Sequence, residues 1–363
     1  MIHIYQVVSD TNVGGAGRYL LNYVRYFDRN RFKVTVLLPE NSALKPLLAE
    51  YPDVSVTEVP YMADKSYDKK CVCFLTDLFR KERVDIIHTH ASLSARIAAR
   101  KAKIKTIIST RHCIEPRGKF PVSFIKSVLN NLLCDYYIAV SDAVRENLLS
   151  CGIRKEKIRT VSNGVEAIKP ITEEKREKLK EQYGIADETV FGIFARLEPV
   201  KGHTYFIEAA KRFLQEGHRG KFLIVGKGSL EQELKKQAEG IPEIVFTGYV
   251  PDTTELLNLS DVNVLSSQSE AMSLAILEAM SLAKPTIATN VGGNGQLISN
   301  GVNGILTEYR NAEDMKSAMV KMAEDKTYYC TCAENARNIY QQTFRADIMV
   351  KNLEKLYEEV SND

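Results

Sequence analysis

The sequence predicts an α/β protein of two doubly wound, Rossmann-like domains of similar size. The first observation is length, since 363 residues exceed what one hydrophobic core usually serves. The second is the alternation of short β-branched runs with amphipathic helical segments, which is typical of parallel sheets covered by helices. The third is a polar, charged stretch at residues 171–188, which we interpret as the connection between the domains.

The strand-like runs fall into two series, which set the predicted domain bounds at 1–165 and 166–344. The first series is residues 2–8, 32–38, 54–59, 84–90, 104–109, 135–141 and 157–162, and the second is 189–195, 221–226, 243–248, 262–267, 285–289 and 304–308. We expect the two domains to face each other across a cleft. Ligands of such domains bind beyond the carboxyl ends of the strands, so the residues that follow each strand are the candidates for function.

Composition favours a soluble, cytoplasmic protein. No apolar run approaches the roughly 18 residues of a membrane span, and the first residues lack the basic and apolar regions of a secretory signal. The seven cysteines lack the paired C-x-x-C spacing of a zinc site, so we expect reduced thiols and no metal.

Charge is divided unevenly between the two halves of the chain. Residues 1–165 carry 26 Lys and Arg against 16 Asp and Glu, whereas the rest carries 23 against 30. Segments 100–105 and 119–133 place cations beside an amphipathic apolar stripe, which suits an anionic membrane surface. A helix that packs its apolar side on its own sheet would show the same pattern. We expect no nucleic-acid partner.

Glycines follow the first predicted strand. Gly14 and Gly15, with Ala16, could let an anion approach the backbone at the start of the next helix. A tight turn explains them equally well. The G-x-G-x-x-G fingerprint of a dinucleotide site is incomplete, because Leu20 occupies the position of its third glycine, and this weakens a dehydrogenase hypothesis.

Histidines follow the fourth and fifth strands, as His88 and His90 and then His112. A histidine at a strand end can be a ligand or only a hydrogen-bonded neighbour of the cleft. The clustering of three of them favours a functional role.

Two cations follow the first strand of the second domain. Arg196 and Lys201 stand between that strand and a predicted helix at 203–214, which suits a diphosphate because Arg binds oxygens through its fork and Lys acts as a mobile charge. Two solvated surface cations are the alternative. The next two strands end in Gly226 and in Gly248 with Tyr249, where a planar base or a tight turn would fit.

Two carboxylates flank the start of a helix in the segment SEAMSLAILEAMSLAKP. Ser273 is a plausible N-cap, which places Glu270 in the preceding loop and Glu278 in the second helical turn. A fully helical span would separate the acids by about 12 Å, so they do not share a proton. The spacing predicts a grip on a long ligand, with sugar or ribose hydroxyls on the carboxylates and phosphates on the helix amides between them.

The order of these motifs resembles the group 1 family of retaining glycosyltransferases with the GT-B fold. The resemblance extends from about residue 4 to about residue 310, and its most specific element is E-x7-E, here Glu270 and Glu278, followed by AKPTIATNVGG. It implies that residues 345–363 form a helix that crosses back onto the first domain. That domain would bind the acceptor, and the second would bind the nucleotide sugar.

The resemblance also implies residue roles. The catalytic group would be His112, Arg196, Lys201 and Glu270, and the donor-binding group would be Gly14, Gly15, Ala16, Gly226, Gly248, Tyr249, Ala271, Met272, Ser273, Leu274 and Glu278. Two positions depart from many relatives: Ala271 replaces a glycine, and Gln296 replaces a glutamate.

We therefore expect a metal-independent enzyme without a cofactor. It would move a hexose-type sugar from a nucleoside diphosphate sugar to a glycan or lipid-linked acceptor, in the cytoplasm or on the inner face of the plasma membrane, in the synthesis of a surface polysaccharide or glycoconjugate. A nonhydrolysing sugar-nucleotide epimerase and a noncatalytic sugar-nucleotide sensor are the alternatives.

Overall fold

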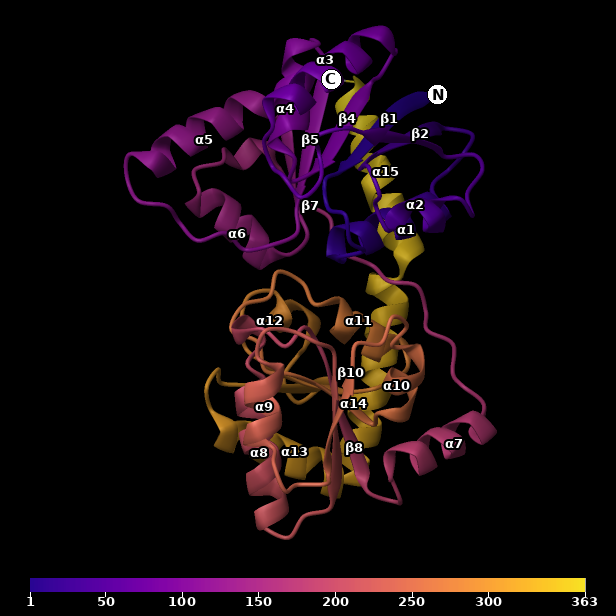
Figure 1. The fold of residues 1–363 in the computed structure, drawn as a ribbon, viewed down its shortest axis with the longest axis vertical. Coiled ribbons are helices and arrows are strands. Elements are labelled where there is room, and N and C mark those ends of the chain that lie inside the picture. Colours follow the sequence, from indigo (N-terminus) through magenta and orange to yellow (C-terminus); the bar gives the residue numbers. More distant parts are fainter. Residues whose placement is uncertain (363) are drawn as a thin grey trace. The chain divides into compact units, whose positions relative to one another are not determined.

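The computed structural model describes residues 1–362 and divides the chain into two compact units (Figure 1). Unit 1 comprises residues 1–165 together with the chain from Arg345 onward, and unit 2 comprises residues 166–344. Asp363, the last residue of the predicted 345–363 segment, lies outside the described residues.

Unit 1 contains a seven-stranded parallel sheet in the order β3-β2-β1-β4-β5-β6-β7. Long apolar runs form its strands because helices cover both faces of the sheet and leave few strand positions in water. The strands are β1 (Ile2–Val8), β2 (Phe32–Pro39), β3 (Ser55–Val59), β4 (Ile86–His90), β5 (Thr106–Arg111), β6 (Tyr136–Ala139) and β7 (Ile158–Thr160). The helical elements are α1 (Gly15–Tyr26), α2 (Leu44–Leu48), α3 (Lys69–Lys81), α4 (Leu93–Lys101), α5 (Val122–Leu133), α6 (Asp142–Ser150), η1 (Lys155–Lys157) and α15 (Ala346–Asn362).

The C-terminal helix α15 is part of the core of unit 1, where it packs beside α1. Tyr357 of α15 is fully buried, and its ring lies edge-on to Tyr23 of α1 at 5.9 Å between centroids. The chain rejoins unit 1 where Val165 accepts a 3.0 Å hydrogen bond from the Ala346 amide. Gly164 is required there, because a Cβ atom would lie 2.5 Å from the carbonyl oxygen of Arg345.

Unit 2 contains a six-stranded parallel sheet in the order β10-β9-β8-β11-β12-β13. Phenylalanines from β8, α8 and β9 pack against one another at the centre of its core, which helices on both faces complete. The strands are β8 (Thr189–Phe194), β9 (Gly220–Val225), β10 (Ile244–Gly248), β11 (Val262–Leu265), β12 (Thr286–Thr289) and β13 (Gly304–Thr307). The helical elements are α7 (Glu173–Tyr183), η2 (Pro199–Lys201), α8 (His203–Gln215), α9 (Glu231–Gln237), α10 (Thr254–Leu259), α11 (Leu274–Ser281), α12 (Asn294–Leu297), α13 (Ala312–Glu324), α14 (Lys326–Ile339) and η3 (Tyr340–Phe344).

The interpretation of residues 171–188 as a plain connection is wrong. Helix α7 occupies most of this segment, begins at Thr172 as its N-cap, and ends at Gly184 in the left-handed conformation. Leu179 is its one buried residue, so the sequence lacks the regular repeat of apolar residues that identifies an amphipathic helix. Arg176 holds the helix on unit 2 by donating to the Asn258 carbonyl at 2.7 Å and to Asp261 at 3.2 Å.

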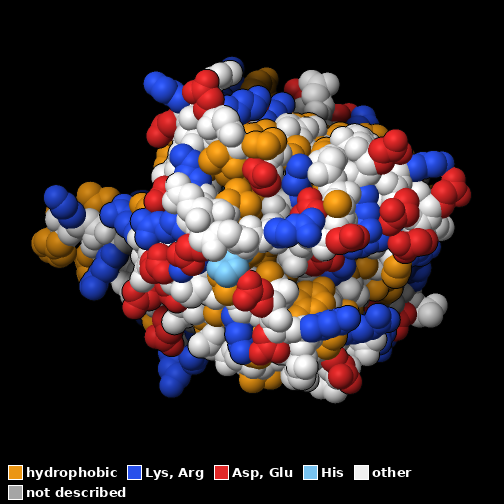
Figure 2. Space-filling model, turned by 90° about the horizontal axis from the view of Figure 1, so that it is seen from below, with side chains coloured by type: hydrophobic (Ala, Val, Ile, Leu, Met, Phe, Trp, Pro, Cys, Tyr) orange, Lys and Arg blue, Asp and Glu red, His pale blue; other side chains and the backbone are white. Residues whose placement is uncertain are grey.

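Helix α5 does not pack its apolar side on the sheet of unit 1. None of its described residues is buried, and its exposed apolar side chains continue the exposed Phe120 that precedes the helix. The helix forms a projection at the left of Figure 1, and the same projection in Figure 2 shows hydrophobic side chains interspersed with Lys and Arg. Within residues 1–362, no helix is long and apolar enough to cross a bilayer.

Candidate functional site

Each sheet has a point where the strand order reverses, and ligands of doubly wound domains bind at the carboxyl ends of the strands beside such a point. In unit 2 the point lies between β8 and β11, and in unit 1 it lies between β1 and β4. The loops after these four strands carry several of the candidate site residues, and the others lie at the ends of β4, β5, β9 and β10.

Lys201 and Glu270 form an ion pair across the switch point of unit 2. Lys201 Nζ lies 2.6 Å from Glu270 Oε1, and the side chains are 21% and 10% exposed, respectively. The Ser267 hydroxyl donates a second 2.6 Å hydrogen bond to the same carboxylate oxygen. The resemblance implied that both charged residues are catalytic, but it did not indicate that they pair.

Backbone contacts between the β8 and β11 loops hold this pair in place. The Ser266 hydroxyl donates to the Lys201 carbonyl at 3.0 Å, and the Gln268 amide donates to the Val200 carbonyl at 2.7 Å. Gly202 has φ +65°, and a Cβ atom there would lie 2.1 Å from the carbonyl oxygen of Ser266. Only glycine lets the two loops come this close, so the glycine that follows Lys201 in the sequence is explained by the packing of the loops.

The turn after β12 also forms hydrogen bonds with the loop that carries Glu270. The Gly293 amide donates to the Glu270 carbonyl at 3.0 Å, and Thr289 Oγ1 donates to the Ser267 carbonyl at 2.6 Å. The conformation of the Glu270 loop thus depends on the TNVGG turn that follows it in the sequence.

Helix α11 begins at Leu274, with Ser273 as its N-cap. The Ser273 side chain makes no capping hydrogen bond, so the amides of the first turn are not satisfied by their cap. Ala271, Met272 and Ser273 are buried, whereas Glu278 in the second turn is partly exposed. Glu270 therefore precedes the N-terminus of α11, and Glu278 lies within the helix.

The remaining unit 2 candidates lie at the ends of β8, β9 and β10. Arg196 is exposed after β8, and Lys227 Nζ lies 5.0 Å from the ring centroid of Tyr249, which is 63% exposed. Gly226 has a structural reason for being glycine, because a Cβ atom would lie 2.1 Å from the Ala195 oxygen. Gly248 has φ +73°, with no atom within 4 Å of the position of a Cβ atom.

In unit 1, Gly14 and Gly15 start α1 beside the switch point. Neither has a positive φ, and a Cβ atom on either would meet nothing within 4 Å. The fold therefore does not require glycine at these positions, and the open space suits the approach of a ligand to the backbone. Ala16 next to them is buried.

His112 is the last member of a buried polar chain in unit 1. Its Nε2 lies 2.8 Å from His90 Nδ1, and His90 Nε2 lies 3.2 Å from Gln6 Oε1. Gln6 Nε2 donates to the Tyr357 hydroxyl at 2.8 Å. The sequence indicated the histidines by their positions at strand ends, but it carried no signal for Gln6 or Tyr357.

Burial keeps these histidines neutral. Desolvation, followed by the positive charge of Arg111, lowers the pKa of His112 to about 4. Desolvation lowers the pKa of His88 to about 3, with a smaller contribution from His112, and it lowers the pKa of His90 well below its usual value. At neutral pH each ring therefore has one N–H group and one lone pair.

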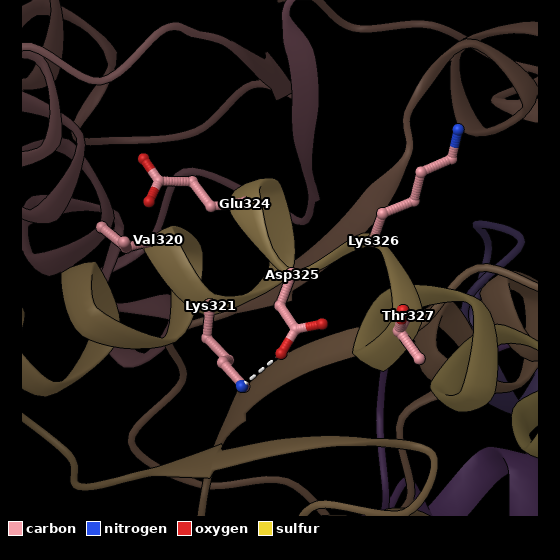
Figure 3. Close-up of a pocket in the computed structure, with 6 residues that line it drawn as sticks. All are labelled: Val320, Lys321, Glu324, Asp325, Lys326 and Thr327. Atoms are coloured by element: carbon pink, nitrogen blue, oxygen red, sulfur yellow. Dashed lines mark hydrogen bonds and ion pairs between the residues drawn. The ribbon is translucent and has the colours of Figure 1, made fainter.

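Two surface hollows lie away from these loops. One is at the end of α13 and the start of α14, where Lys321 pairs with Asp325 (Figure 3). Helix α13 follows β13 and runs antiparallel to the strands, so this hollow lies at the amino ends of the strands of unit 2. The other lies along α15 in unit 1. Within residues 1–362, no three His, Cys, Asp or Glu side chains gather as a metal ion would require.

The chain matches two family models. Residues 175–339 match "Glycosyl transferases group 1", and residues 13–168 match "Glycosyltransferase Family 4". The chain is 29% identical to the UDP-Gal:alpha-D-GlcNAc-diphosphoundecaprenol alpha-1,3-galactosyltransferase of Escherichia coli, covering 95% of this chain and 94% of that protein. It is 26% identical to the N-acetyl-alpha-D-glucosaminyl L-malate synthase of Bacillus anthracis, over 86% and 84% of the two chains.

Solved structures share the fold of the whole chain. HepE of Anabaena, crystallised with UDP-glucose, superposes with a TM-score of 0.86 at 24% identity, covering 99% of this chain and 100% of that one. TarM of S. aureus, crystallised with UDP, has a TM-score of 0.78 at 15% identity and covers 100% of each chain.

Proposed function

Because the chain belongs to the group 1 glycosyltransferase family, we propose that it transfers a hexose-type sugar from a nucleoside diphosphate sugar to a glycan or lipid-linked acceptor, with retention of the anomeric configuration. The Lys201–Glu270 pair carries this proposal. It places a cation for phosphate and a carboxylate for sugar hydroxyls 2.6 Å apart, beside the switch point where a doubly wound domain binds its ligand.

The E. coli relative supports the choice of donor and acceptor classes. Its name specifies UDP-Gal and a diphosphoundecaprenol-linked sugar. For the present chain we propose a UDP-sugar donor and a lipid-linked or glycan acceptor, in polysaccharide or glycoconjugate synthesis. A thermal-shift comparison of UDP, GDP, ADP and CMP sugars tests the donor, because a ligand that binds only the folded state raises its stability. If no nucleotide raises the melting temperature, the donor assignment is wrong.

In the proposed reaction, the bond between the anomeric carbon and the diphosphate oxygen breaks, and its electron pair leaves with the diphosphate. The acceptor hydroxyl forms the new bond on the same face, and its proton passes to the leaving oxygen. Arg196, Lys201 and the amides at the start of α11 would neutralise the growing charge, as a divalent ion does in other enzymes. We therefore expect EDTA to leave the transfer rate within about twofold, and a larger loss that Mg²⁺ restores would contradict this part of the proposal.

Kinetics of three variants test the assignment of roles. Arg196→Ala and Lys201→Ala should each lower kcat on the order of 10²-fold, because charge on the diphosphate grows as the bond breaks. Glu278→Ala should mainly raise KM for the donor, because a ribose contact is equally strong before and during the reaction. Lys326→Ala is the control, since this exposed lysine lies at the amino ends of the strands, away from the loops that carry the candidate site.

The proposal fails if Arg196→Ala and Lys201→Ala both keep the wild-type kcat at saturating donor while remaining folded. Incubation of the donor without an acceptor provides a further test. Formation of a new sugar nucleotide in that incubation would favour an epimerase, and donor binding without any transfer would favour a sensor.

We also propose that α5 docks on an anionic membrane from the cytoplasmic side, where a lipid-linked acceptor would be found. Its apolar side chains include Phe124 and Leu132, which are 62% and 64% exposed. Lys126 within the helix, and Arg117 and Lys119 just before it, supply positive charge. Such a combination of apolar area and cations binds anionic lipid surfaces.

Co-sedimentation with vesicles of phosphatidylglycerol and phosphatidylcholine at low salt tests this docking. Phe124→Ser combined with Leu132→Ser should reduce the bound fraction several-fold, whereas Val302→Ser, at a 46% exposed position of unit 2, should not. If the wild-type protein stays in the supernatant, α5 does not bind membranes.

A further inference from the structure

The loop after β11 contains two consecutive buried serines that bond different partners. Strand β11 lies between β8 and β12 in the sheet of unit 2, so this loop lies between the loops that follow those strands. The Ser266 hydroxyl donates to the carbonyl of Lys201 in the β8 loop, whereas the Ser267 hydroxyl donates to the carboxylate of Glu270. Both serines are fully buried, and buried hydroxyls require such partners. Ser266 thus holds the backbone of one member of the ion pair, and Ser267 holds the side chain of the other.

The two oxygens of the Glu270 carboxylate have different surroundings. Oε1 accepts from the Ser267 hydroxyl and from the Lys201 ammonium group, each at 2.6 Å. A glutamate carboxylate that is paired with an ammonium group is ionised and only accepts hydrogen bonds, so the hydroxyl of Ser267 is the donor. Oε2 accepts from no donor within residues 1–362 and, unlike the buried atoms that lack a partner, it is open to solvent. The carboxylate is therefore held by one oxygen and presents the other.

A side chain of β12 holds the backbone of Ser267. The backbone pairing of β11 with β12 ends before this residue, and Thr289 Oγ1 then donates to the Ser267 carbonyl at 2.6 Å. Asn294 Nδ2 donates to the carbonyl of Thr289 at 2.9 Å, and both of these side chains are buried. Because a carbonyl oxygen only accepts, the direction of both bonds is fixed. The chain of donors runs from Asn294 through Thr289 and Ser267 to Glu270.

We propose that Ser267 and Thr289 are positioning residues for Glu270. Thr289 fixes the backbone of Ser267, and Ser267 together with Lys201 holds Oε1, so that Oε2 accepts a hydrogen bond from a hydroxyl of the donor sugar. The use of Oε2 for a sugar rests on the proposed function, but the hydrogen-bonded chain does not. The side chains of Ser267 and Thr289 are at most 1% exposed, so their effect on the donor passes through Glu270.

Isothermal titration calorimetry with UDP, UDP-glucose and UDP-galactose tests this positioning. UDP lacks the transferred sugar and does not use Oε2. In Thr289→Val we expect the affinity for the UDP-hexose that the wild type binds better to fall about tenfold, as for the loss of one hydrogen bond to a charged group, whereas the affinity for UDP should change less than twofold. Thr289→Ser keeps the hydroxyl and should restore the affinity. Ser267→Ala should behave as Thr289→Val does, and it serves as a second variant if Thr289→Val does not fold.

Thr307→Val is the matched control. Thr307 lies at the end of the neighbouring strand β13 and is 1% exposed, and its Oγ1 donates to the Ala288 carbonyl at 3.4 Å. This bond has no connection to Glu270, so its loss should change neither affinity. If Thr289→Val and Ser267→Ala lower the affinities for UDP and for the UDP-hexose equally, the two residues only stabilise the fold. If neither variant changes either affinity, they do not position Glu270.

Hydrogen–deuterium exchange of the full chain without any ligand tests the chain of donors separately. The amides of Gln268 and Gly293 donate to the carbonyls of Val200 and Glu270. We expect Thr289→Val to raise their exchange rates about tenfold and Thr307→Val to leave them unchanged, and unchanged rates in Thr289→Val would overturn the positioning. Binding of UDP but of neither UDP-hexose by the wild type would instead refute the sugar contact together with the proposed donor.

Discussion

Replacing Lys201 with methionine removes the ammonium group beside Glu270, and we expect the loss of stability to depend on whether Glu270 keeps its charge. In Lys201→Met, the carboxylate is only 10% exposed and retains the Ser267 hydroxyl as a partner. A charge left without its counter-ion in such surroundings is destabilising. In Lys201→Met combined with Glu270→Gln, that charge is gone, so much of the lost stability should return.

The magnitude follows from the geometry of the pair. Two unit charges 2.6 Å apart attract by about 6 kcal/mol at an effective dielectric constant of about 20. Desolvation of the two groups offsets most of this attraction. We therefore expect a coupling free energy of about 1–2 kcal/mol between Lys201 and Glu270, and a loss of about 2–3 kcal/mol in Lys201→Met alone.

A double-mutant cycle measured by equilibrium urea unfolding provides the assay. The control cycle is Lys178–Glu174 on α7, where the same atoms are also 2.6 Å apart but the side chains are 68% and 78% exposed. The coupling there should be no more than about 0.5 kcal/mol. If the Lys201–Glu270 coupling is no larger than that of the control, burial does not strengthen the pair, and the reasoning from its exposure is refuted.

Two further predictions concern stability. Gly202→Ala should lower the free energy of unfolding by about 2–4 kcal/mol, because φ is positive there and the new Cβ atom would lie only 2.1 Å from the Ser266 carbonyl oxygen. Gly217→Ala, with φ +88° and open space, should lose only about 1 kcal/mol. Equal losses in urea unfolding would contradict the argument from the close contact. The pKa of His88 falls from 6.5 in the unfolded chain to about 3 in the folded one, so its contribution to stability is complete above pH 6.5 and is lost as the pH falls toward 3. From pH 7.5 to pH 5.5 this loss is about 1.4 kcal/mol, and His88→Gln should show a correspondingly shallower pH dependence of unfolding; an unchanged slope would show that His88 is not held neutral.

Much of the fold could be predicted because its signals are local. Apolar β-branched runs and helical periods recur within a few residues, so the strands of both sheets and helices such as α1, α8 and α11 could be located from the sequence. Helix α7 could not be recognised, since a single buried leucine produces no period. The exposure of α5 was equally inaccessible, because an amphipathic stripe has the same pattern whether it covers a sheet or faces solvent.

The sequence by itself determined which chemical groups are present and near which strand ends they stand: two cations after β8, two acids around the start of α11, and histidines at the end of β4 and after β5. Only the tertiary structure decided which of them meet. Lys201 and Glu270 are 69 residues apart, and Gln6 and Tyr357 are 351 apart. Contacts over such separations arise from the order of strands in a sheet and from the return of α15 to unit 1, and neither leaves a periodic trace in the local sequence.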